Sequence, residues 1–317
     1  MKSILLKIAL FFSLLTLPLI GLFLVPYSEE FAYHYIENDC YNHGAWIYDR
    51  INRNPTPIDI AFIGSSHTIH AFQDKKIEEL LGFNNRVTNL GYCRYGRNLE
   101  YVMLKMLLDK KSPKFIVFEV HEDEEKNSHD IFPYLAETSD LVQTPTPLNR
   151  DYLADLFHGA SGRLEYFKAR FIFRKKYPEP GSELFGYGAS DRQVTPEELT
   201  ENEKAWKKRL NRTSIEFVEE AKVKYPFAYL DKMIRMVEEK KIPFLFVYLP
   251  EYGSKLKNPK YESYYKTIAP VLIPPQLIFD DVSNWMDASH LNDKGSALLS
   301  DWMANQLKIE FCTKKQN

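Results

Sequence analysis

The sequence has little excess charge of either sign. Its 317 residues include 41 Lys and Arg against 43 Asp and Glu, and no long block carries a single sign. Domains that bind nucleic acids or other polyanions usually present a basic face or stripe. The composition gives no electrostatic argument for such a partner, and no nucleic-acid binding is predicted.

Cysteine is also scarce. The chain has only Cys40, Cys93 and Cys312, and their spacing matches no metal site. They allow at most one intramolecular disulfide, and in an oxidising compartment Cys40 could pair with Cys93. Because Cys is often buried as a small apolar residue, three ordinary thiols are the favoured interpretation. No metal and no organic cofactor is predicted.

The apolar residues are most concentrated within residues 1–27. Lys2 and Lys7 precede a segment without any charge, Ile8 to Tyr27. A helix needs about 20 apolar residues to cross a hydrocarbon core about 30 Å thick. The segment ends without an Ala-x-Ala cleavage pattern, which favours an uncleaved transmembrane anchor over a signal peptide. Lysines before it and acids after it, at 29–30, predict that the rest of the chain lies outside the cytoplasm.

Beyond a linker predicted at residues 28–57, apolar strands alternate with amphipathic helices over residues 58–317. The strands are expected at Ile58 to Ile63, Val87 to Leu90, Phe115 to Val120, Phe244 to Leu249 and, as a short last strand, Leu277 to Phe279. Apolar, β-branched strands separated by helices favour a mostly parallel sheet covered on both faces. The predicted fold class is α/β, in one domain.

Residues 122–224 interrupt this alternation and are predicted to form a helical insertion or cap beside the site. Within them, Thr195, Pro196 and Glu198 give a typical helix start, with an N-cap, a first-position proline and a capping-box acid. The run from His121 to Glu125 is interpreted as a solvated loop rather than a set of metal ligands.

A serine follows the first predicted strand. The segment Phe62-Ile-Gly-Ser-Ser-His-Thr68 places Ser66 at the carboxyl end of that strand, where open α/β sheets form their ligand crevices. A serine hydroxyl needs a base to take its proton and a group to orient that base. Asp287 and His290, three residues apart before the last helix, can supply both.

Each of these motifs alone has a structural explanation. A Gly-Ser-Ser triplet is commonly a turn with an N-cap serine, and Asp287 could cap the last helix. Their joint occurrence favours a catalytic triad of Ser66, His290 and Asp287. His67 and His70 are assigned to structure or substrate contact, because side chains next to a nucleophile usually diverge from it.

The two motifs resemble the conserved blocks of the SGNH, or GDSL, hydrolase superfamily. Its Gly-Asp-Ser after strand one reads Gly-Ser-Ser here, and its Asp-x-x-His before the last helix reads Asp287-Ala-Ser-His290. The resemblance implies a three-layer, flavodoxin-like sheet with Ser66 as nucleophile. It also implies an oxyanion hole formed by the N–H groups of Ser66 and Gly91.

The sequence departs from this superfamily at the third block. Where the family has Gly-x-Asn, this chain has Phe118-Glu-Val-His121-Glu122, so the asparagine donor is missing. His121 or Asn89 could replace it, or two backbone donors could suffice. With the N-terminal anchor, the chain resembles the extracytoplasmic acyl-transfer branch, which includes the D-alanyl transfer protein of teichoic acid synthesis and alginate O-acetyltransferases.

The resemblance implies a membrane-anchored enzyme that carries an acyl group on Ser66. The group would pass to or from a cell-envelope polysaccharide, without a cofactor, and a separate membrane protein would deliver it across the bilayer. Two alternatives stay open. One is a catalytically silent SGNH-like domain that binds a glycan or scaffolds an assembly. The other is a lipase or thioesterase with an apolar crevice.

Overall fold

A five-stranded parallel sheet lies at the centre of the protein. The computed structural model describes residues 2–24, 27–82, 86–143, 149–210 and 216–314. The strands run in the order β2-β1-β3-β4-β5. Their bounds are Ile60–Ile63 for β1, Val87–Asn89 for β2, Phe115–Val120 for β3, Phe244–Tyr248 for β4 and Val271–Leu272 for β5. The sheet confirms the α/β class and the first four predicted strands.

Both faces of the sheet are buried, which explains why its strands are mostly apolar. Along β3, Ile116, Phe118 and Val120 face one core, whereas Phe115 and Val117 face the other. Side chains alternate across a strand, so a strand covered on both sides is mostly apolar, and a polar residue within it needs hydrogen-bond partners.

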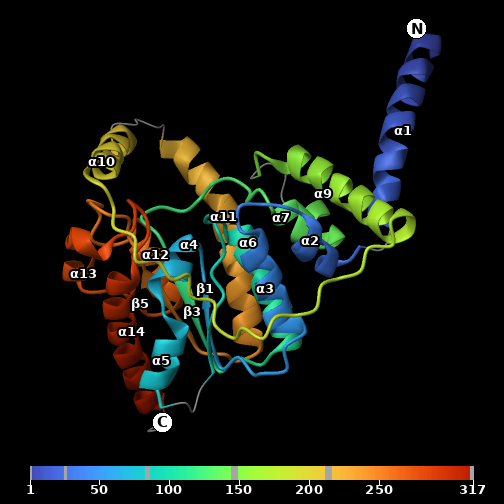
Figure 1. The fold of residues 1–317 in the computed structure, drawn as a ribbon. Helices are drawn as coiled ribbons and strands as arrows, with labels where there is room; N and C mark the ends of the chain where they lie inside the picture. The colour runs from blue at the N-terminus through green and yellow to red at the C-terminus, as the bar shows by residue number, and fades with distance from the viewer. Residues whose placement is uncertain (1, 25–26, 83–85, 144–148, 211–215, 315–317) are drawn as a thin grey trace.

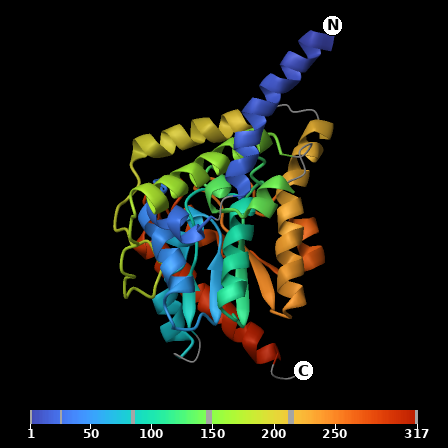
Figure 2. The same cartoon turned by 90° about the vertical axis from the view of Figure 1, so that its right-hand side faces the viewer.

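Helices cover each face of the sheet, as Figures 1 and 2 show. The first face packs against α3 (Tyr41–Asn52), α6 (Arg97–Lys110) and α11 (Glu216–Glu239). The second packs against α5 (Asp74–Leu80), α13 (Gln276–Asp280) and α14 (Asp293–Lys314). The result is a three-layer α/β arrangement.

The linker predicted at residues 28–57 is wrong. These residues form α2 (Glu29–Tyr35) and α3, and Tyr33, Ile47 and Ile51 belong to the core. Short helices are marginal in isolation, so α2 and α3 depend on packing these side chains against the rest of the protein.

The last predicted strand is also wrong. Leu277 to Phe279 lies in α13, and the edge strand is β5, which follows α12 (Glu262–Ile268). Three consecutive apolar residues are too few to show whether the hydrophobic pattern has the period of a helix or of a strand. Pro275 precedes the run as the N-cap of α13, and Ile278 and Phe279 are buried against the second face.

The predicted insertion is mainly helical. It contains α7 (Phe132–Leu135), α8 (Thr138–Val142), α9 (Tyr152–Phe167), the π-helical turn η1 (Lys168–Ile172) and α10 (Pro196–Leu210). The capping box of α10 is confirmed: Glu198 N–H donates to Thr195 Oγ1 (3.3 Å), and Thr195 N–H donates to Glu198 Oε2 (2.9 Å). Residues 177–195, here called the strap, run from η1 to α10 without regular structure.

The N-terminal helix α1 (Lys2–Leu24) projects from the body beside α9, away from the C-terminal end of α14 (Figures 1 and 2). Among the described residues, no helix combines the length and the apolar character that a membrane crossing requires.

Cys40 and Cys93 form a disulfide, with their Cα atoms 5.6 Å apart. The interpretation of all three cysteines as ordinary thiols is therefore wrong for this pair. The bond joins the N-cap of α3 to the loop after β2. The side chain of Cys312 lies outside the described residues.

Candidate active site

Ser66 is the first residue of α4 (Ser66–Ala71), which begins two residues after β1. Ser65 is its N-cap, and the Oγ atom of Ser65 accepts a hydrogen bond from the N–H of His67 (3.1 Å). At the first position of a helix, the N–H of Ser66 has no acceptor within the helix. The serine hydroxyl and this N–H therefore lie together at the carboxyl edge of the sheet.

The structure brings the three predicted triad residues together. Ser66 Oγ lies 2.7 Å from His290 Nε2. His290 Nδ1 in turn lies 2.9 Å and 3.0 Å from the two carboxylate oxygens of Asp287. In this arrangement Nδ1 carries a proton that it donates to Asp287, which leaves Nε2 as the acceptor for the serine proton.

Asp287 is held as a carboxylate by the turn that contains it. Its Oδ1 atom accepts hydrogen bonds from the N–H groups of Ser289 (2.7 Å) and His290 (2.8 Å). Burial would raise the pKa of Asp287, but the His290 ring and these two N–H groups lower it to about 2. Buried Trp285 anchors the turn, because its indole N–H donates to the carbonyl of Phe279 (2.9 Å).

A second acidic residue, Glu119, lies beside the start of α4 and was not identified from the sequence. Its side chain is fully buried at the end of β3. It accepts hydrogen bonds from Ser65 N–H (2.7 Å), Ser65 Oγ (2.8 Å) and Thr68 N–H (3.1 Å), and also from the Thr68 hydroxyl. The carboxylate thus satisfies donors in the first turn of α4. The one signal in the sequence was an acid within an otherwise apolar strand.

Gly64 makes room for this carboxylate. A Cβ atom at position 64 would lie 2.2 Å from Glu119 Oε2 and 2.3 Å from Thr68 Oγ1. Any other residue would push Glu119 away from the first turn of α4. The glycine of the Gly-Ser-Ser motif is therefore required by close approach of the carboxylate.

His121 pairs with Glu119 and lies against the tilted rings of Tyr95 and His67. It contacts the Glu119 carboxylate, and its ring centre lies 4.2 Å from Tyr95 and 4.4 Å from His67. Burial would lower the pKa of His121, but the charge and hydrogen bond of Glu119 raise it. Burial, with His121 alongside, lowers the pKa of His67 to about 3. His121 is thus held as a cation beside a neutral His67.

Among the described residues, His67, Glu119 and His121 form a group whose ligand atoms lie within 4.8 Å of one another. Two imidazoles and a carboxylate are a ligand set used by several transition metals. However, the donors from Ser65, Thr68 and His121 already explain the buried charge of Glu119 without an ion. The group is sufficiently described as a hydrogen-bonded ion pair.

The two side chains proposed as substitute oxyanion donors are already engaged. Asn89 is fully buried, and its Nδ2 atom donates to the carbonyls of Thr68 (2.7 Å) and Phe72 (2.9 Å) at the end of α4. The Nε2 atom of His121 contacts Glu119 and lies 3.2 Å from Ser65 Oγ. The interpretation of Asn89 as an oxyanion donor is wrong because both of its amide hydrogens have acceptors.

Gly91 approaches α4 closely. A Cβ atom there would lie 2.7 Å from both Ser65 O and Ile69 N. The Gly91 N–H donates to Asn89 Oδ1 (3.1 Å), and the Gly91 carbonyl lies 3.0 Å from Nε2 of His43. Burial lowers the pKa of His43 to about 4, so this ring is neutral and donates to the carbonyl. Of the four residues considered for the oxyanion hole, Ser66 and Gly91 offer backbone donors.

His70 joins the site to the strap. Its Nδ1 atom lies 2.6 Å from the carbonyl of Gly188, and its ring centre is 5.1 Å from that of His290. Burial, followed by the nearby His290, lowers the pKa of His70. His70 is thus a neutral contact between the strap and the triad.

The acidic run after β3 is not the solvated loop that the sequence predicted. Glu122 and Glu124 are buried, at 7% and 4% exposure. Glu122 Oε1 accepts the N–H of Glu251 (2.8 Å), and Glu124 pairs with Arg97, which is also buried (2.8 Å). These acids are buried because tertiary partners satisfy them, which a local pattern does not reveal.

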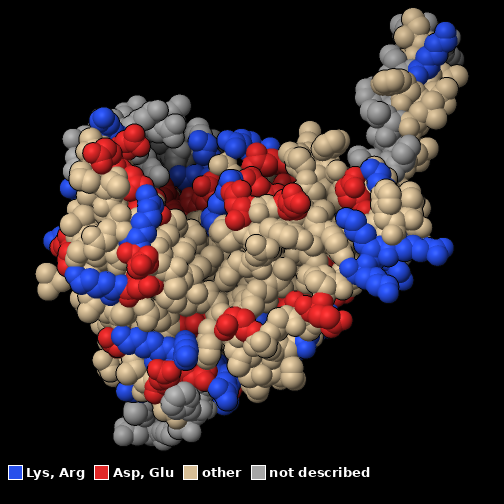
Figure 3. Space-filling view, viewed as in Figure 1, with Lys and Arg blue, Asp and Glu red and all other residues tan. Residues whose placement is uncertain are grey.

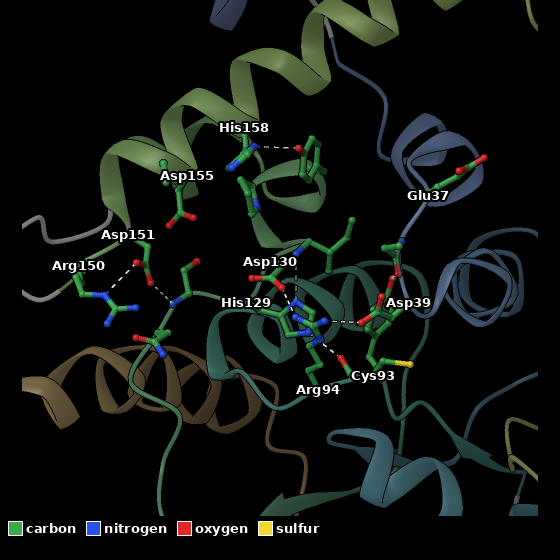
Figure 4. Close-up of a pocket in the computed structure, with 18 residues that line it drawn as sticks. Glu37, Asp39, Cys93, Arg94, His129, Asp130, Arg150, Asp151, Asp155 and His158 are labelled. Carbon is green, nitrogen blue, oxygen red and sulfur yellow. Dashed lines mark hydrogen bonds and ion pairs between the residues drawn. The ribbon is translucent and has the colours of Figure 1, made fainter.

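Two cavities of about 570 and 750 Å³ lie in the described part of the protein, away from the triad. The smaller has several charged residues in its lining, and Figure 4 shows Arg94 between Asp39 and Asp130. Neither cavity is lined by a triad residue.

Comparison with protein-family models found no match to this chain. No curated protein matches it either.

Proposed function

We propose that this protein is an extracytoplasmic serine-dependent acyl-ester enzyme that transfers an acyl group to, or removes it from, a cell-envelope polysaccharide. The observation that carries the proposal is the 2.7 Å contact between Ser66 Oγ and His290 Nε2, with Asp287 on the other ring nitrogen. The strand order 2-1-3-4-5 is the flavodoxin-like order of doubly wound sheets, which agrees with an SGNH-type fold.

The reaction would proceed in two halves. Ser66 Oγ attacks the acyl carbonyl while its proton moves to His290 Nε2. His290 then gives that proton to the departing oxygen, and the acyl group stays on Ser66. In the second half, a water or sugar hydroxyl gives its proton to His290 and attacks the acyl-serine, and the proton returns to Ser66. Asp287 stays ionised and stabilises the imidazolium that forms in each half.

The oxyanion would form next to the N-terminus of α4. The N–H of Ser66 has no helical acceptor, and the Gly91 N–H would turn from Asn89 Oδ1 to the substrate oxygen or be shared with it. Two backbone donors would thereby replace the asparagine that the third block lacks.

The exposure of the site favours a large acceptor. The side chains of His290 and Asp287 are 22% and 27% exposed, so the triad is open to solvent. A polysaccharide hydroxyl can reach such a site without threading into a pocket. A lipase or thioesterase would need an apolar crevice for its acyl chain, and neither described cavity borders the triad.

The location outside the cytoplasm is part of this proposal. It depends on the lysines before the uncharged N-terminal segment and on the acids after it. The Cys40–Cys93 disulfide supports it independently, because such bonds persist in oxidising compartments. A membrane protein that supplies the acyl group is a further, untested part of the proposal.

Active-site labelling of the full chain tests the proposal. Incubation with a fluorophosphonate, followed by intact-protein and peptide mass spectrometry, should give one adduct on Ser66. The Ser66→Ala variant should give none. The Ser65→Ala variant should still give an adduct on Ser66, because Ser65 Oγ is buried against Glu119 and is not the labelled atom, although the lost N-cap and Glu119 contact should slow the labelling. If the folded wild-type protein gives no adduct, the proposal is wrong.

A catalytically silent SGNH-like domain is the second candidate. The observation that favours it is the engagement of both Asn89 and the Gly91 N–H before any substrate binds. This candidate predicts that the Ser66→Ala variant keeps its biological role and any glycan affinity, whereas an enzyme would lose its acyl-transfer product.

A further inference from the structure

The insertion exposes a stripe of large apolar side chains. More than half of the exposed large apolar residues in the described part of the chain outside α1 lie between residues 153 and 173. They are Leu153, Phe157, Leu164, Phe167, Phe171, Ile172 and Phe173, with exposures from 39% to 77%. Soluble surfaces rarely gather so many apolar side chains in one place without a partner.

Four residues of the stripe lie along one face of α9 and η1. Leu153, Phe157, Leu164 and Phe171 are separated by four, seven and seven residues, which is close to whole turns of a helix. The opposite side packs into the protein through buried Asp155, Gly159 and Gly162, and Ala160, which the spacing places within the stripe, is buried as well. The helix therefore already buries one side against the protein, and the exposed stripe is a further apolar surface.

Basic side chains gather at the C-terminal end of the stripe. Arg170, Arg174, Lys175 and Lys176 are exposed there, while Glu165, the nearest acid on α9, is paired with Lys168 (2.7 Å). Figure 3 shows these cations as a blue cluster beside the base of α1. An apolar stripe flanked by Lys and Arg is typical of helices that lie in the interface of a bilayer with anionic headgroups.

The position of α1 agrees with this partner. The guanidinium of Arg163 on α9 lies over the rings of Phe23 (4.8 Å) and Tyr27 (4.7 Å), which bracket the end of α1. Figures 1 and 2 show α9 crossing the base of α1. If α1 anchors the chain in a bilayer, α9 lies at the level of that bilayer's surface.

We propose that the stripe of α9 and η1 docks on the surface of an anionic lipid bilayer, with Phe157 and its neighbours in the headgroup and acyl boundary. The occupant is lipid, since the cations at one end complement anionic headgroups. The inference goes beyond the proposed activity and does not depend on Ser66.

Spin labels at two exposed positions of the full chain test this proposal. Phe157→Cys on α9 and Leu277→Cys on α13 are each made in a Cys312→Ser background and labelled with the Cys40–Cys93 disulfide intact; Leu277 is exposed and lies outside the stripe. The protein is mixed with vesicles of phosphatidylglycerol and phosphatidylcholine, or of phosphatidylcholine alone. The collision rates of each spin label with oxygen and with a water-soluble nickel chelate then report how deeply that label lies in the bilayer.

The ratio of the oxygen collision rate to the nickel collision rate should be several-fold higher for the label at position 157 than for the label at position 277. Replacing Arg174, Lys175 and Lys176 by Gln should weaken that preference in the anionic vesicles only. Equal nickel access at both positions, or failure to bind vesicles, would overturn the proposal. Dipolar coupling between labels at 157 would overturn it in favour of a second copy of the chain. Fluorophosphonate labelling of Ser66 in the same samples reports the proposed activity separately.

Discussion

The buried carboxylate of Glu119 accepts hydrogen bonds from both the N–H (2.7 Å) and the hydroxyl (2.8 Å) of Ser65. Since Ser65 directly precedes the nucleophile, this contact fixes the start of α4 and with it the direction of Ser66. His121 balances the charge on the other side and contacts the same carboxylate. Glu119 is thus a positioning residue that acts on Ser66 through its neighbour.

Glu119→Gln should weaken both the fold and the site. A glutamine amide can accept only through one oxygen and leaves the cationic His121 without its counter-charge. Breaking a buried pair in this way costs about 3 to 5 kcal/mol. Urea unfolding should detect the loss, and the rate of Ser66 labelling should fall at a temperature where the variant is folded. Glu122→Gln, which keeps its acceptor for Glu251, is the control. An unchanged labelling rate would show that Glu119 stabilises the fold but does not position Ser66.

Asp287→Asn should slow acylation without unfolding the protein. An asparagine oxygen can still accept the N–H groups of Ser289 and His290, so the turn is kept. It no longer carries the charge that stabilises the imidazolium, and it favours the wrong tautomer of His290. In triads of this kind the rate falls on the order of 10⁴-fold. Stopped reactions with a p-nitrophenyl ester measure the rate, and a melting temperature within a few degrees of wild type confirms the fold. Full activity would remove Asp287 from the triad.

The stability of the protein should depend on pH through Asp74. Burial raises the pKa of this carboxyl to about 7 from an ordinary value of 3.8, although N–H groups of Asn89 and Gly186 partly oppose the shift. The folded protein therefore holds the proton more tightly than the unfolded chain does. This stabilisation is complete below about pH 4 and is lost as the pH rises through about 7. The two pKa values bound the effect at about 4 kcal/mol.

Asp74→Asn should flatten this dependence, because an amide does not titrate in the range. The free energy of unfolding, measured with urea between about pH 4 and pH 8, should change less in the variant than in wild type. Asp301→Asn on α14, a half-exposed aspartate paired with Lys76, should leave the wild-type profile unchanged. Identical profiles for wild type and Asp74→Asn would contradict the prediction.

Loss of the Cys40–Cys93 disulfide should destabilise the protein. The bond joins residues separated by 53 positions, and chain-entropy models assign a loop of that length about 4 kcal/mol. The double variant Cys40→Ser/Cys93→Ser should unfold at lower urea concentration than wild type under non-reducing conditions. A reductant should shift wild type towards the variant and leave the variant itself unaffected. Cys312→Ser controls for the third thiol, and an unaltered midpoint in the double variant would contradict the expected contribution.

Much of the sheet was predictable because β1, β3 and β4 are almost entirely apolar. Segments such as Phe115–Val120 are too short and too β-branched to be mistaken for surface helices. The meeting of Ser66, His290 and Asp287 was predictable for a related reason, since parallel strands deliver their carboxyl ends to one edge. The sequence-based predictions failed for α2, α3 and α13, where the local hydrophobic pattern does not indicate which side chains are buried in the folded protein.

The supports of the site were harder to foresee. Glu119 is an acid that the sequence places in a strand, and only its partners on α4 explain why it is tolerated there. Asn89 was read as a donor to substrate, yet it serves the carbonyls at the end of α4. Both contacts join segments far apart in the chain. No local rule connects an asparagine after one strand to the end of a helix after another.

The strap between η1 and α10 is held through many backbone groups, and also through side chains such as Tyr187, whose hydroxyl donates to Asp293 Oδ1 (2.7 Å). Carbonyls of Pro178, Glu183, Leu184 and Gly188 accept from side chains of the body, and N–H groups of Gly186 and Ser190 donate to carboxylates. At positions 186 and 188 a Cβ atom would collide with Trp46 or Ile69. Apart from residues such as Tyr187 and Val194, whose side chains contact the body, many strap residues should be exchangeable. Inserting or deleting one residue, by contrast, would shift every later backbone contact, including the one between Gly188 and His70 beside the triad.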